Sequence, residues 1–79
     1  MTRSQTATAV SLLKRAAELR GEAVAAEQSW NTLHLVDGLR AAQFAAENAY
    51  VRHMRPTFEA LTMAEGMALS KRLHRLAAA

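Results

Sequence analysis

The side chains able to bind a metal ion or a cofactor are few and widely spaced in this 79-residue chain. His34 and Asp37 lie three residues apart and could share a metal ion, whereas His53 and His74 lie among arginines and lysines. Neighbouring positive charge opposes both protonation of a histidine and binding of a cation. No histidine pair has the i,i+4 spacing of a helical zinc site. We therefore predict no metal, haem or other cofactor.

Acid–base and nucleophilic chemistry has equally little support. Glu18 and Glu22 lie one helical turn apart, with Lys14 and Arg15 one turn before Glu18, which is the pattern of surface ion pairing. The chain has no cysteine, no glycine-rich phosphate loop and no Gly-x-Ser-x-Gly nucleophile turn. The sequence therefore predicts a protein that is not an enzyme.

Uncharged stretches are too short to cross a membrane. The longest one without Asp, Glu, Lys or Arg, Ser4–Leu13, has ten residues, about half of a membrane-spanning helix. Met1–Arg20 carries four basic residues and one acidic residue, which we interpret as the start of a helix rather than a targeting peptide. We expect no membrane association and a cytoplasmic protein.

The composition predicts an all-α fold in a single domain, residues 1–79. Eighteen residues are Ala, only 22 are larger apolar residues, and Ile is absent. Ala and unbranched side chains favour helix, and β-branched residues are too few for several strands. A chain of this length buries only about 60% of its unfolded surface. We therefore expect self-association to supplement a thin core.

Heptad spacing predicts a first helix over residues 5–35, with Ser4 or Thr6 as its N-cap. Apolar residues recur there at alternating intervals of three and four, as in a helix that packs along one stripe. This predicted seam, a core or a dimer contact, comprises Ala9, Leu12, Ala16, Leu19, Ala23, Ala26, Trp30 and Leu33.

Two shorter helices should follow, over residues 38–55 and 56–76. Asp37-Gly38 is the strongest turn signal, and Pro56 suits the first position of a helix. The sequence leaves open whether these two helices form one kinked rod. A first helix of about 45 Å is longer than a second of about 25 Å, so part of the seam should be covered by the third helix or by a second copy. We therefore predict a homodimer.

The positive charge lies in the second half of the chain. Residues 1–37 carry four basic and four acidic residues, whereas residues 38–79 carry six basic and three acidic residues. We expect partner binding at the predicted bend and in the last helix, through Arg52, His53, Arg55, Lys71, Arg72 and Arg75.

Two classes of partner fit these residues. We favour a larger protein with an acidic surface or groove, bound by a small adaptor, regulator or stoichiometric inhibitor of the kind that phages and mobile elements encode. Nucleic acid is the alternative, since the same side chains would contact phosphates.

Overall fold

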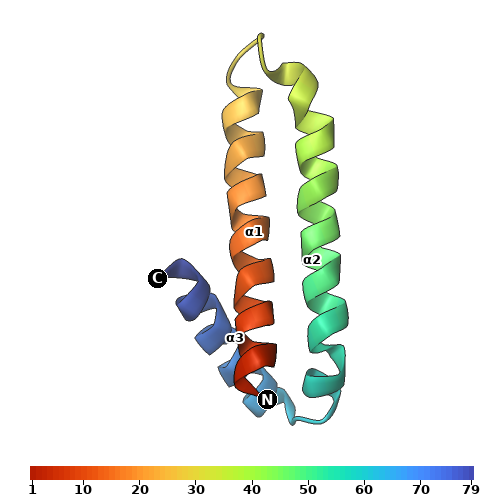
Figure 1. Cartoon of the computed structure of the whole chain (residues 1–79), viewed down its shortest axis with the longest axis vertical. Helices are drawn as coiled ribbons and strands as arrows, with labels where there is room; N and C mark the ends of the chain where they lie inside the picture. The colour runs from red at the N-terminus through yellow and green to blue at the C-terminus, as the bar shows by residue number, and fades with distance from the viewer.

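The computed structural model describes all 79 residues and consists of helices joined by short connections, which confirms the all-α prediction. The elements are α1 (Arg3–Glu27), the 3₁₀ turn η1 (Leu33–Leu35), α2 (Val36–Glu59) and α3 (Met63–Ala78). Helices α1 and α2 form a long antiparallel hairpin, and α3 lies obliquely against the end that holds the N-terminus (Figure 1).

A capping box begins α1 at Thr2, two residues before Ser4 and four before Thr6, the two predicted caps. The Thr2 hydroxyl accepts a hydrogen bond from the backbone N–H of Gln5, at 3.1 Å. The Gln5 side chain accepts one in return from the backbone N–H of Thr2, at 2.8 Å. Two N–H groups that the first turn leaves unpaired are thereby satisfied.

The prediction that the first helix reaches residue 35 is wrong, because α1 ends at Glu27. The Thr32 hydroxyl donates to the carbonyl oxygen of Ala26 at 2.9 Å, and the Ser29 hydroxyl accepts from the N–H of Asn31 at 3.3 Å. Such local side-chain bonds compete with helical pairing. Trp30 therefore lies in a loop, and the seam prediction fails for it and for Leu33.

Helix α2 is longer than the predicted 38–55. Asp37-Gly38 forms its first turn rather than a loop, where the Asp37 carboxylate suits the positive end of the helix dipole. Pro56 lies inside the helix rather than at the start of the next one. A proline lacks the N–H that would bond the carbonyl of Arg52, but packing of Phe58 against the core keeps the last turn helical.

Helix α3 begins at Met63 instead of at Pro56, because Thr62 and Glu65 form a second capping box. The Thr62 hydroxyl accepts from the N–H of Glu65 at 3.2 Å, and the Glu65 carboxylate accepts from the N–H of Thr62 at 3.0 Å. Helices α2 and α3 are therefore two separate helices and do not form one kinked rod.

The core lies where the three helices meet. Ala9 of α1, Met54 of α2 and Leu73 of α3 are fully buried there, and neighbouring apolar side chains pack around them. Along the hairpin, the interior of α1 continues through the buried residues Ala16, Leu19, Ala23 and Ala26, with Leu12 half-buried.

The two long helices have nearly equal lengths, 25 and 24 residues. Helix α2 therefore runs beside the whole of α1, and a second copy is not needed to cover the seam. The predicted difference in length between the first two helices, which was an argument for a homodimer, is therefore absent, because α1 ends earlier and α2 is longer than predicted.

The chain is nevertheless elongated and thinly packed. It measures 46 × 23 × 22 Å, with a radius of gyration of 14.6 Å, whereas a compact domain of this length has about 11.6 Å. It exposes 5642 Å², whereas a compact monomer of 8.6 kDa exposes about 4,700 Å². No helix is both long enough and apolar enough to span a bilayer.

Candidate functional site

Folding separates the charges of the chain into two ends. The basic end, which we define as residues 1–15 and 51–79, carries eight Lys or Arg and two acidic residues, a net charge of +6. The acidic end, residues 16–50, carries two Arg and five acidic residues, a net charge of −3. One ion pair joins them, between Arg15 and Glu18 at 3.6 Å. The molecule is therefore electrically polar along its long axis.

Five of the six predicted partner-binding residues are exposed at the basic end, namely Arg52, Arg55, Lys71, Arg72 and Arg75. The structure does not bring all of them into one groove. Arg52 and Arg55 line a depression on α2, whereas Arg72 and Arg75 line a groove between α3 and the C-terminal part of α2. Together they form a cationic surface rather than a convergent pocket.

The sixth predicted residue, His53, is engaged inside the fold. Its Nε2 atom lies 2.9 Å from the carbonyl oxygen of Gln5 in α1, and the side chain is half-buried. Because a carbonyl oxygen only accepts, Nε2 carries the proton in this contact. His53 therefore joins α1 to α2, and its imidazole is less accessible to a partner than the five cationic side chains.

A methionine-lined groove of about 470 Å³ adjoins the basic end. Met63 is 83% exposed and Met67 is 56% exposed. Phe58 and Leu61 lie in the same groove. Methionine side chains adapt to irregular partner surfaces, so this groove combines apolar contact with the surrounding positive charge.

A second apolar surface is exposed toward the acidic end. It lies on the same face of the hairpin that α3 covers at the basic end. On α2, Phe44, Val51 and Phe58 recur every seven residues, and residues so spaced drift by only about 20° around a helix. Phe58 lies against Gly66 of α3, within 3.6 Å of the position a Cβ would take. Val51, beside the last turns of α3, is 50% exposed, and Phe44, one heptad earlier on α2, is 65% exposed.

The same pattern holds on α1. Val10 packs against the core beside Leu73 of α3, whereas Ala17 and Val24, seven and fourteen residues later, are exposed. We call the exposed surface formed by Ala17, Val24, Phe44 and Val51 the open face; Ala17 and Val51 lie at its border, where they also line a groove beside the C-terminal end of α3. Figure 1 shows that no helix lies over the hairpin beyond the C-terminal end of α3.

A groove of about 430 Å³ lies between the C-terminal end of α3 and the hairpin. Its apolar lining includes Leu13, Tyr50 and Ala77, and Arg20 and Glu47 are its charged residues. The Tyr50 ring meets the His74 ring edge to face, with centroids 6.2 Å apart.

The Tyr50 hydroxyl is buried in this groove and has no hydrogen-bond partner of good geometry. Burial raises the pKa of the phenol above its ordinary value of 10.0, and the nearby Ser70 hydroxyl offsets part of this rise. Tyr50 therefore remains neutral at physiological pH and contributes packing rather than acid–base chemistry.

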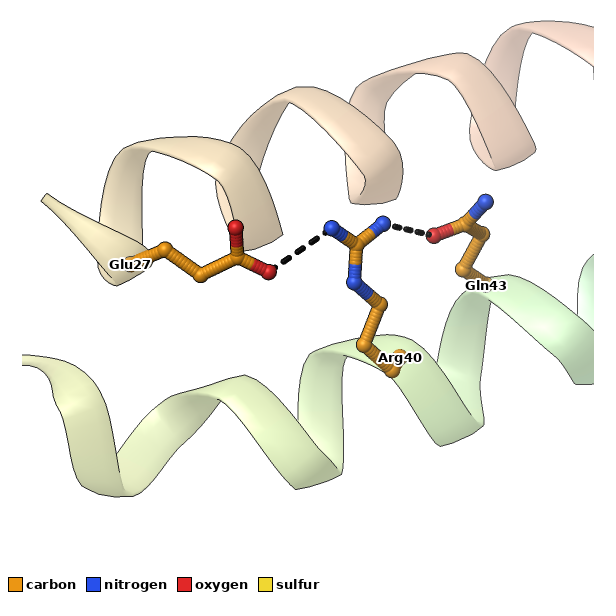
Figure 2. Close-up of polar contacts among 3 residues, drawn as sticks. All are labelled: Glu27, Arg40 and Gln43. Carbon is orange, nitrogen blue, oxygen red and sulfur yellow. Dashed lines mark hydrogen bonds and ion pairs between the residues drawn. The ribbon is translucent and has the colours of Figure 1, made fainter.

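A polar network closes the hairpin at the acidic end. Arg40 of α2 donates to Glu27 of α1 at 2.8 Å and to Gln43 at 3.0 Å (Figure 2). Gln43 in turn donates to Glu47 at 3.0 Å. The ion pair is partly exposed, so it contributes about 0.2–1 kcal/mol to stability. The network joins the two helices, and its residue Glu47 lines the same groove as Ala17 and Val51 of the open face.

No group of three His, Asp or Glu side chains converges on a point that could hold a metal ion. The sequence contains the seven-residue repeats of the open face, Val10-Ala17-Val24 and Phe44-Val51-Phe58, but it did not predict an exposed apolar surface there. Periodicity alone does not show that these residues are exposed, since only the position of α3 determines where they lack cover. The chain matches no family model, no curated protein and no solved structure.

Proposed function

We propose that this chain is a non-enzymatic protein–protein interaction module that binds an acidic protein surface through its basic end. The single observation that carries the proposal is the net charge of +6 gathered at one end beside exposed Met63 and Met67. Charge of one sign steers the encounter with an oppositely charged partner, and apolar side chains supply the affinity. A module of this kind acts as an adaptor, a regulator or a stoichiometric inhibitor of a larger protein.

The test is chemical cross-linking in a lysate of the source cells, followed by purification of the tagged chain. The test variant replaces Arg52, Arg55, Lys71, Arg72 and Arg75 with alanine, while His53 stays because it holds α1 to α2. The control is Arg20→Ala, which removes a cation from the acidic end. We expect the five-fold variant to lose the partner and the control to keep it. Capture of the same partner by both variants would refute the proposal.

Nucleic-acid binding is the second candidate, and the same observation favours it. Eight Lys or Arg at one end would neutralise several phosphates and release their counterions. Anisotropy of a labelled DNA duplex between about 50 and 200 mM salt separates the two candidates. Binding that falls by orders of magnitude over this range supports nucleic acid, whereas no binding at the lower salt concentration leaves the protein partner.

A further inference from the structure

The open face of the acidic end lacks cover over most of its length. Val10 to Val24 spans about 21 Å at 1.5 Å per residue, and α3 covers only the first part of that distance (Figure 1). Three large apolar side chains, Val24, Phe44 and Val51, are between 46% and 65% exposed there. Exposed apolar side chains gathered on one face are typical of a protein interface.

The outer surface of α3 has the pattern of a second packing face. Five exposed residues recur at intervals of four, three, four and three, the spacing of helices that pack side by side. They are Ala64, Ala68, Lys71, Arg75 and Ala78. Ala68 and Arg75 lie at the edge of this surface, where they also line the groove between α3 and the C-terminal part of α2. Three of them are small, so a neighbouring helix can approach closely, and two are cationic with long apolar stems.

The chain exposes more surface than a compact monomer of its mass, and this excess area is close to the area that one partner buries in a stable interface. It exposes 5642 Å², about 950 Å² more than a compact monomer of its mass. A standard interface removes about 800 Å² from each partner. Burial of a surface of this size in an interface would bring the chain to the surface area expected of a compact protein.

Charge identifies the occupant. The outer surface of α3 belongs to the basic end, which carries a net charge of +6, whereas Ala17, Val24 and Phe44 of the open face belong to the acidic end, which carries −3. Beside the open face, Arg40 is paired with Glu27, and Arg20 lies in the same groove as Glu47, so the complementarity lies in the net charge of each end. A second copy turned by 180° places each basic end against the acidic end of the other. A two-fold arrangement of this kind uses the same two surfaces twice and closes on itself.

We propose that two copies of this chain pair antiparallel, with α3 of each copy packed on the open face of the other. The pairing rests on the proposed function, in which the basic end binds an acidic protein surface. Here that surface is the acidic end of a second copy of the chain. In this arrangement α3 lies between its own hairpin and that of the partner. The exposed loop around Trp30 then lies at the level of Met63 and Met67 of the partner copy.

Light scattering of the purified full chain between about 1 and 500 µM tests the pairing. We expect a mass of two chains at the upper end of this range, with a dissociation constant that rises when salt is increased from about 0.05 to 0.5 M, because screening weakens contacts between the two ends. A monomer at every concentration would overturn the proposal, as would a mass that keeps growing beyond two chains.

Two variants locate the interface. Phe44→Glu places a charge on the open face and should weaken pairing at least tenfold, whereas Ala45→Glu, the matched control one residue away, should leave it unchanged. Lys71→Glu/Arg75→Glu should also weaken it. A two-chain mass that withstands Phe44→Glu, or that forms only when duplex DNA is added, would overturn the proposal. Circular dichroism checks that each variant is folded.

The Phe44→Glu variant also separates this inference from the proposed function, because Phe44 lies outside the basic end. A monomeric Phe44→Glu chain that still captures the cellular partner shows that the basic end binds a different protein as well. If the wild-type chain is monomeric and yet captures a partner, the pairing is refuted and the proposed function stands.

Discussion

The Nε2 atom of His53 lies 2.9 Å from the carbonyl oxygen of Gln5, and this hydrogen bond joins residues 48 positions apart in the chain. It ties the C-terminal part of α2 to the first turns of α1, close to the buried residues Ala9 and Met54. A residue that the sequence marks as a candidate for partner binding thus has a structural contact of its own.

Replacement of His53 by alanine should lower the free energy of unfolding by about 1 kcal/mol, because it removes one hydrogen bond made by a half-buried side chain. In a domain of this size, that corresponds to a fall in Tm of about 4–8 °C. His34→Ala is the matched control, since His34 is exposed and makes no side-chain hydrogen bond. Thermal unfolding followed by circular dichroism measures both. Equal Tm values for the two variants would contradict the structural role.

Replacement of Leu73 by alanine should destabilise the chain by about 2–5 kcal/mol, because this fully buried side chain fixes α3 to the hairpin. The whole domain has only about 4–12 kcal/mol of stability at the usual values per residue. Leu76→Ala, on the same helix but 45% exposed, should cost about 1 kcal/mol or less. Urea unfolding measures both, and similar losses would show that α3 does not pack as described.

Tyr50→Phe should leave stability unchanged or raise it by up to about 1 kcal/mol, because the buried hydroxyl has no well-formed hydrogen bond to lose. The raised pKa of Tyr50 also has a consequence at high pH. The neutral phenol is favoured in the folded state, so its contribution is fully present below pH 10 and is lost as pH rises through the folded pKa. Urea titrations at several pH values from neutral to alkaline should show a steeper alkaline loss for the wild type than for Tyr50→Phe.

Thr62→Ala should cost about 1 kcal/mol, because it removes the N-cap that starts α3. Hydrogen bonds from Thr62 lower the pKa of Glu65 below its ordinary value of 4.5. The contribution of the Glu65 carboxylate is therefore present above that value and is lost as the solution becomes more acidic. Glu65→Gln keeps a capping side chain but does not titrate. Its stability should depend less on pH in the acid range, and an identical acid profile would refute this role.

The local determinants of the helices could be read from the sequence, although some were assigned wrongly. Thr2-x-x-Gln5 and Thr62-x-x-Glu65 are capping boxes set by residues three apart, and the hydroxyls of Ser29 and Thr32 bond nearby backbone groups. The heptad spacing continued through this loop by coincidence of composition. The predicted end of the first helix at residue 35 is wrong because these hydroxyls compete for backbone hydrogen bonds, an effect that apolar periodicity does not reveal.

Composition by itself determined that the chain is helical, since an Ala-rich sequence with few β-branched residues has no competing structure. Charge polarity was decided by the tertiary structure alone. Residues 1–15 and 51–79 lie at opposite ends of the sequence, and they form one basic end only because the hairpin reverses the chain. The open face likewise exists because α3 begins at Met63 and reaches only part of the hairpin. Which apolar residues stay uncovered depends on where a distant helix ends, and that is a property of packing rather than of periodicity.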